Sequence, residues 1–196
     1  MADSQERSEG DVAGRVLSAG RRGIGSFHTP ERLVGELRAA HPQDSKDMTV
    51  GRLIRLHCTE GALQGAASGL GGIFTLVITL PLSLFAGGVI QARLAYAIAL
   101  VYGHDLDSAE TESTVAHCLI GGRGTSATAA GVSGPKALTA ALRRKAVRGV
   151  GTRLLTRIGG EGAARLIPVA GAAVAGAMDY GFTHAVATRA VEAFRR

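Results

Sequence analysis

The feature that most constrains this chain is a long stretch without charge, because no charged side chain occurs between Glu60 and Arg93. So many apolar residues in a row must be kept from water, either in a protein core or in a bilayer. The single proline in the stretch lacks the N–H group that a helix interior needs. We therefore predict one helix that ends near Thr79, a break at Leu80-Pro81, and a second helix from Leu82 to Tyr102.

Glycines recur at every fourth position where this stretch begins, at Gly61, Gly65 and Gly69. Each glycine inside a helix costs about 1 kcal/mol relative to alanine, so three of them in register need a structural reason. Residues four apart share a helix face, and a face without side chains lets a neighbouring backbone approach closely. Two further segments have small residues at this spacing: Gly88 with Ala92, and Ala172 with Gly176. We predict that the three small faces pack against one another.

The apolar hairpin from Gly61 to Tyr102 is long enough to cross a bilayer, which takes about 20 mostly apolar residues. Arg93 nevertheless lies near the middle of the second predicted helix, where an arginine costs roughly 2.5–3.5 kcal/mol on insertion. Asp179 interrupts the last predicted helix in the same way. A buried pair of Arg93 and Asp179 would solve both problems. Two interpretations stay open: a compact bundle that buries the hairpin, and a hairpin that is inserted in the membrane.

Helix start and stop signals in the rest of the chain predict an all-α protein. Thr29 is placed to cap a helix that has Pro30 at its first position, Gly103 to end the apolar helix, and Asp107 or Ser108 to cap the next one. Another predicted helix runs from about Thr49 into the glycine repeat, and the remaining ones cover about residues 29–40, 108–120, 135–158 and 169–194. We expect a disordered or weakly ordered tail over residues 1–25 and a single domain over 26–196. The predicted fold is a compact helical bundle around a Gly/Ala-rich apolar helical hairpin.

The positive charge of the chain is concentrated in its second half. The formal net charge is +6, with a pI near 10.0. Such a surface favours an anionic partner, either phospholipid head groups or nucleic acid, although a merely solvated basic face has the same composition. Only 4% of the residues are aromatic, which argues against base stacking and so against nucleic acid. The candidates for contact with a lipid surface are Lys136, Arg143, Arg144, Lys145, Arg148, Arg153 and Arg157.

The sequence contains no recognisable catalytic, cofactor or metal motif. His57-Cys58 and His117-Cys118 suggest zinc, but adjacent helical residues point about 100° apart and the usual ligand spacings are absent. There is no phosphate loop, no GxSxG and no HExxH. We therefore expect no enzyme activity, no cofactor, no metal and no small-molecule substrate. The N-terminus lacks a basic-then-apolar signal peptide, so a reducing, cytoplasmic setting is expected.

Two runs of the chain together resemble the EcsC family of bacterial proteins. They are TLPLSLFAGGVIQARLAYAIALVYGHDLDS, from Thr79 to Ser108, and RLIPVAGAAVAGAMDYGFTHAVATRA, from Arg165 to Ala190. The resemblance extends from about Thr49 to Phe194. It implies a helical, membrane-associated protein on the cytoplasmic side of the bacterial inner membrane. The family is named from a gene beside an ABC transporter, so a transporter as partner is implied by the resemblance alone. It supplies no catalytic residues. The family often has asparagine where this chain has Asp179.

Three functional interpretations follow from these observations. The first is a peripheral or hairpin-inserted membrane protein whose basic helix, over residues 135–158, docks on anionic lipid. The second is a bundle that shelters its apolar hairpin in solution and releases it into membranes on a trigger. The third is a soluble scaffold or adaptor whose basic surface meets an acidic protein or nucleic acid.

Overall fold

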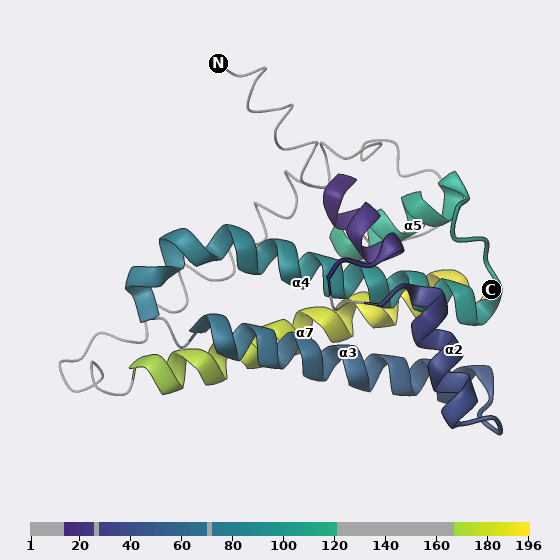
Figure 1. Ribbon diagram of the computed structural model, residues 1–196, viewed down its shortest axis with the longest axis horizontal. Coiled ribbons are helices and arrows are strands. Elements are labelled where there is room, and N and C mark those ends of the chain that lie inside the picture. Colours follow the sequence, from purple (N-terminus) through teal and green to yellow (C-terminus); the bar gives the residue numbers. More distant parts are fainter. Residues whose placement is uncertain (1–13, 26–27, 70–71, 121–166) are drawn as a thin grey trace, which may run out of the picture.

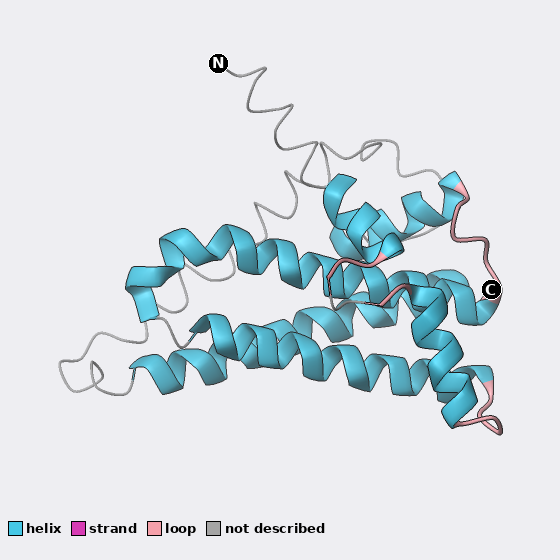
Figure 2. Cartoon of the chain, in the orientation of Figure 1, coloured by secondary structure: helices cyan, strands magenta, loops and turns pink. Residues whose placement is uncertain are grey.

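The computed structural model describes residues 14–25, 28–69, 72–120 and 167–196, and within these ranges the chain is all-α, as predicted (Figures 1 and 2). A short helix over residues 14–22 comes first. The longer helices that follow are α2 (Pro30–Ala40), α3 (Lys46–Gly69), α4 (Gly72–Tyr102), α5 (Ala109–Ile120) and α7 (Ile167–Phe194).

Three long helices form the body of the molecule. α7 packs along α3, and both also contact α4 (Figure 1). α2 lies across one end of this body, where it contacts α4 and α3, and α5 packs on α4 and α7. α3 and α4 follow each other along the chain and run in opposite directions, so they form the apolar hairpin.

Local signals set the ends of the helices. The Thr29 hydroxyl accepts a hydrogen bond from the backbone N–H of Arg32 at 3.3 Å, which confirms the predicted cap of α2. Gly103 ends α4 with φ +97°, a backbone conformation that side chains other than glycine rarely adopt. Ser108 caps α5, because its hydroxyl accepts a hydrogen bond from the N–H of Thr111 at 3.1 Å.

The predicted break at Leu80-Pro81 is wrong. α4 continues through this position as one helix from Gly72 to Tyr102. A proline inside a helix removes one backbone hydrogen bond and kinks the helix. The helix continues past the proline when the residues on both sides keep helical geometry, as they do in α4. Figure 1 shows α4 changing direction within its first turns. The hairpin therefore consists of α3 and α4. It does not consist of one helix that ends at Thr79 and another that begins at Leu82, as the sequence predicted.

The core lies around the C-terminal half of α4, where consecutive residues from Val89 to Ala99 are buried almost without exception. Leu53 of α3 and Val186 and Phe194 of α7 pack in the same cluster. A helix that is buried all round in this way has neighbours on every side, which explains why no amphipathic pattern marks it in the sequence.

Part of the segment that we expected to be a weakly ordered tail is packed. Val16 and Leu17 of the helix over residues 14–22 are buried and belong to the core cluster. A Cβ atom on Gly20 would lie 2.5 Å from the Cβ of Ala92 in α4, so the two helices are in close contact there. Packing thus begins before residue 25, whereas residues 1–13 lie outside the described ranges.

The predicted basic helix over residues 135–158 also lies outside the described residues. The same holds for all seven candidates for lipid contact that the sequence suggested, from Lys136 to Arg157.

Candidate functional site at one end of the bundle

Three uncharged segments meet at one end of the bundle. They are residues 61–69 of α3, 72–92 of α4 and 167–178 of α7, and none contains Asp, Glu, Lys or Arg. In Figure 1 all three lie at the left end of the molecule. We call these segments the charge-free end. At 1.5 Å per residue its longest member, in α4, is about 30 Å long, which is close to the thickness of the hydrocarbon layer of a bilayer.

An ion pair marks the border of the charge-free end. The guanidinium group of Arg93 on α4 pairs with the carboxylate of Glu60 on α3. These are the two residues that bracket the uncharged stretch in the sequence, and the antiparallel hairpin brings them together. The Arg93 side chain is only 4% exposed, so a partner of opposite charge is what makes its burial tolerable.

The predicted pair of Arg93 with Asp179 is therefore wrong. We expected the two charges within apolar helices to neutralise each other, but Glu60 provides the carboxylate for Arg93. Asp179 instead lies on the side of α7 that faces Gly65 of α3. The sequence could have suggested Glu60, because it is the last charged residue before the uncharged stretch.

His57 completes this polar cluster as a neutral side chain. Its Nδ1 donates a hydrogen bond to the carbonyl of Leu53 at 2.8 Å, because a carbonyl can only accept. Its Nε2 accepts one from Nε of Arg93 at 3.2 Å. Burial, and then the positive charge of Arg93, lower the pKa of His57 to about 3. The cluster thus consists of the Arg93–Glu60 ion pair and a neutral imidazole. The imidazole donates to the backbone of α3 and accepts from Arg93.

The glycines of α3 lie against α7. A Cβ on Gly65 would be 2.7 Å from the carbonyl oxygen of Ala175 and 2.5 Å from a carboxylate oxygen of Asp179. A Cβ on Gly61 would be 2.8 Å from the hydroxyl of Thr183. From the other helix, a Cβ on Gly176 would be 2.8 Å from the carbonyl oxygen of Ala62. Backbone atoms of the two helices are therefore in close contact over about one turn of each.

The remaining residues of the predicted small faces are distributed differently. Ala172 is buried, and the surroundings of Gly69 are not described. Gly88 and Ala92 of α4 face the helix over residues 14–22: a Cβ on Gly88 would lie 3.1 Å from Val16. The prediction that all three small faces pack against one another is thus wrong for α4. The reason is that a short N-terminal helix, not recognised in the sequence, occupies that face.

Asp179 is a carboxylate at the edge of the charge-free end. Burial raises the pKa of Asp179 to about 6. Desolvation by burial is the cause of this shift, and Asp179 lies on α7, outside the Arg93–Glu60 pair that joins α4 to α3.

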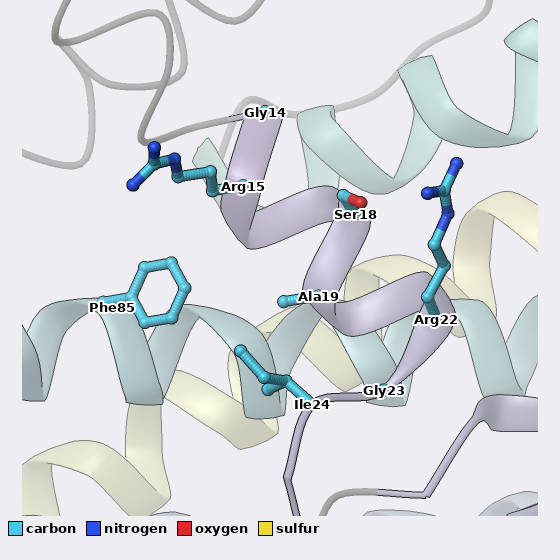
Figure 3. A pocket seen from close by; sticks show the side chains of 8 residues that line it. All are labelled: Gly14, Arg15, Ser18, Ala19, Arg22, Gly23, Ile24 and Phe85. Atoms are coloured by element: carbon cyan, nitrogen blue, oxygen red, sulfur yellow. The ribbon is translucent and has the colours of Figure 1, made fainter.

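A pocket of about 570 Å³ opens between the helix over residues 14–22 and α4 (Figure 3). Two arginines, Arg15 and Arg22, and the hydroxyl group of Ser18 belong to its lining, together with the apolar side chains of Ile24 and Phe85. In Figure 3 the guanidinium group of Arg15 lies on the side of Phe85, and Arg22 extends from the other end of the short helix. Phe85 is part of the charge-free end, so the pocket adjoins it.

The histidine–cysteine pairs do not meet in a metal site. Among the residues that the structure describes, no three His, Cys, Asp or Glu side chains gather closely enough to hold a metal ion. Cys58 and Cys118 are buried free thiols, and burial raises the pKa of Cys118 to about 11. Thiols with raised pKa values are weak nucleophiles and poor metal ligands.

One described helix is long and apolar enough to cross a membrane. The stretch is Phe85–Tyr102 of α4, with a mean hydropathy of 1.4, and 67% of it is buried inside the bundle. Core helices of water-soluble proteins have the same length and composition.

These features define a class: an all-α bundle in which a helical hairpin and the last helix form one uncharged end. The chain belongs to the EcsC protein family, whose model matches residues 40–196. The family match confirms the resemblance seen in the sequence, and it leaves out the helix over residues 14–22 that forms one wall of the pocket. Neither the curated proteins nor the solved structures contain a match to this chain.

Proposed function

We propose that this protein is a non-enzymatic, membrane-associated protein whose charge-free end enters the apolar layer of an anionic membrane. The observation that supports this proposal is the convergence of the three uncharged segments at one end of the bundle. A charged side chain at the bilayer centre costs several kcal/mol, so an end whose described helices contain no charge is the part of the described molecule that can enter at least cost.

The border of the charge-free end also suits this arrangement. Arg93 and Glu60 neutralise each other there, so a bundle inserted up to this level does not bring the Arg93 guanidinium group to the lipid without a counter-charge. Leu63, which lies beyond the border on α3, is 66% exposed. An exposed leucine among uncharged neighbours gains about 25 cal/mol for each Å² of apolar surface that lipid covers.

Basic residues lie where lipid head groups would be. Arg15 and Arg22 are exposed and adjoin the charge-free end at Phe85. A basic side chain near an anionic membrane surface contributes about 1 kcal/mol, and the effect falls off within a Debye length. The seven basic residues between Lys136 and Arg157 would add to this attraction, which makes the binding sensitive to salt.

The test is co-sedimentation of the full chain with vesicles of phosphatidylglycerol and phosphatidylcholine. Leu63→Glu introduces a charge into the charge-free end, and we expect it to lower the bound fraction about tenfold or more, because a carboxylate in the apolar layer costs over 1.4 kcal/mol. Leu56→Glu is the matched control: it lies two turns earlier on the same exposed face of α3, before the border at Glu60. Thermal melts show whether both variants are folded. Equal losses of binding in the two variants would contradict the proposal.

A further inference from the structure

We propose that the pocket between the helix over residues 14–22 and α4 binds a single amphiphilic anion, a molecule with a phosphate-like head and one alkyl chain. This inference deepens the proposed membrane association and rests on it for the choice of a lipid as the ligand. The volume of about 570 Å³ lies in the range of small-molecule sites.

The head-group side of the pocket is formed by one face of the short helix. Arg15, Ser18 and Arg22 are spaced three and four residues apart and therefore lie on the same side of it. Guanidinium and hydroxyl groups are donors that match the oxygen atoms of a phosphate. Two of the described residues that line the pocket are arginines, and none of these described residues is acidic.

Arg21, between these residues in the sequence, has a different role. It forms ion pairs with Glu31 at 2.5 Å and with Asp107 at 3.0 Å, and these tie the short helix to α2 and to the start of α5. Arg21 thus holds the short helix in place, while Arg15 and Arg22 belong to the lining of the pocket at opposite ends of that helix (Figure 3).

The chain side of the pocket is apolar. The ring of Phe85, the side chain of Ile24 and the methyl group of Ala19 line it (Figure 3). Ile24 is 50% exposed although it is a large hydrophobic residue. Because Phe85 belongs to the charge-free end and Arg15 lies on its side of the pocket, an alkyl chain beside Phe85 leads from Arg15 to the part of the molecule that we place in lipid (Figure 3).

The experiment is isothermal titration of the full chain with decyl phosphate below its micelle concentration. Inorganic phosphate tests the head group alone, and decyl maltoside tests an uncharged head on the same chain. We expect decyl phosphate to bind at least about tenfold more tightly than either, because only this probe uses both sides of the pocket.

Two variants test the residues. Arg15→Gln with Arg22→Gln should weaken binding of decyl phosphate about tenfold or more, since it removes the charged donors. Arg38→Gln with Arg55→Gln removes the same charge from exposed positions on α2 and α3, and it should change the affinity less than about twofold at physiological salt. Ile24→Ser should weaken decyl phosphate without affecting inorganic phosphate.

The inference is overturned if the control pair weakens binding as much as the pocket pair, or if inorganic phosphate binds as tightly as decyl phosphate. Vesicle binding separates this inference from the proposed function. Vesicle binding without decyl phosphate binding would remove the pocket and leave membrane association. Decyl phosphate binding that depends on Arg15 and Arg22, without vesicle binding, would keep the pocket and identify its ligand as a soluble amphiphile.

Discussion

At the scale of single residues, Arg93 and Asp179 lie in surroundings that act differently on their charged forms. Arg93 is deeply buried and has Glu60 and His57 as hydrogen-bond partners. Asp179 lies against the backbone of Gly65 of α3, and its burial favours the protonated form. The first arrangement stabilises a charge, whereas the second disfavours one.

Replacing Asp179 by asparagine is expected to stabilise the protein at neutral pH. The folded-state pKa of about 6 lies above the ordinary aspartate value of 3.8, so the stability that the neutral carboxyl contributes is complete below pH 3.8 and is lost as the pH rises through 6. Asp179→Asn should therefore gain of the order of 1 kcal/mol at pH 7.5, discounted for partial exposure, and little below pH 4. Thermal melts over this pH range measure the gain. Glu192→Gln, on an exposed part of the same helix, is the control, and an equal gain there would contradict the role of burial.

Removing the partner of Arg93 is expected to destabilise the fold. Glu60→Gln leaves the guanidinium group buried beside a neutral amide, which should cost up to about 3 kcal/mol. Adding Arg93→Met removes the buried charge as well, so the double variant should recover a large part of the loss. Urea denaturation of Glu60→Gln, of Arg93→Met and of the double variant provides the values. Strictly additive losses would mean that the ion pair does not connect the two residues energetically.

At the scale of helices, the close contacts are made by glycine. α3 and α7 approach until backbone atoms of one meet the glycines of the other, as at Gly65 and Ala175. α4 repeats the arrangement with the short N-terminal helix, through Gly20 and Gly88. The helix propensity lost at these glycines is offset by the contact area that a thin helix allows.

Two glycines of the same helix provide a matched test of this packing. A Cβ on Gly51 meets nothing within 4 Å, so Gly51→Ala should stabilise α3 by up to about 1 kcal/mol through helix propensity alone. At Gly65 the added methyl group collides with the carbonyl of Ala175, and Gly65→Ala should destabilise by about 1–3 kcal/mol. The free energy of unfolding in urea measures both. Similar values for the two variants would contradict the packing of α3 on α7.

At the scale of the whole molecule, the two ends of the bundle differ in polarity. Opposite the charge-free end, Asp47 of α3 binds Arg195 at 2.7 Å and the hydroxyl group of Tyr102 at 3.0 Å. Asp44 and Arg52 form another ion pair near the start of α3. A molecule with one charged and one uncharged end has a defined orientation at an interface between water and lipid.

This polarity predicts how the native protein behaves in cell fractions. We expect it in the membrane fraction at low salt. A wash at high salt that releases it would indicate electrostatic docking through basic side chains. Resistance to both high salt and carbonate would indicate that the charge-free end is embedded. Protein that stays wholly with the water-soluble fraction would contradict membrane association and favour the scaffold interpretation.

The sequence by itself determined the features that depend on neighbours along the chain. The cap at Thr29, the stop at Gly103 and the all-α class follow from residues within one or two turns. The uncharged stretch between Glu60 and Arg93 is likewise visible without any structure. The break predicted at Leu80-Pro81 was wrong, because whether a helix tolerates a proline depends on what the rest of the helix packs against.

Only the tertiary structure decided which helix faces meet. The pairing of Arg93 with Glu60 joins residues 33 positions apart, and the pocket joins the short N-terminal helix to Phe85. Every helix here has small or apolar residues on several sides, so periodicity does not single out the face that a given neighbour covers. The convergence of three uncharged segments at one end follows from the directions of α3, α4 and α7, which are set by packing of the whole bundle and not by any one segment.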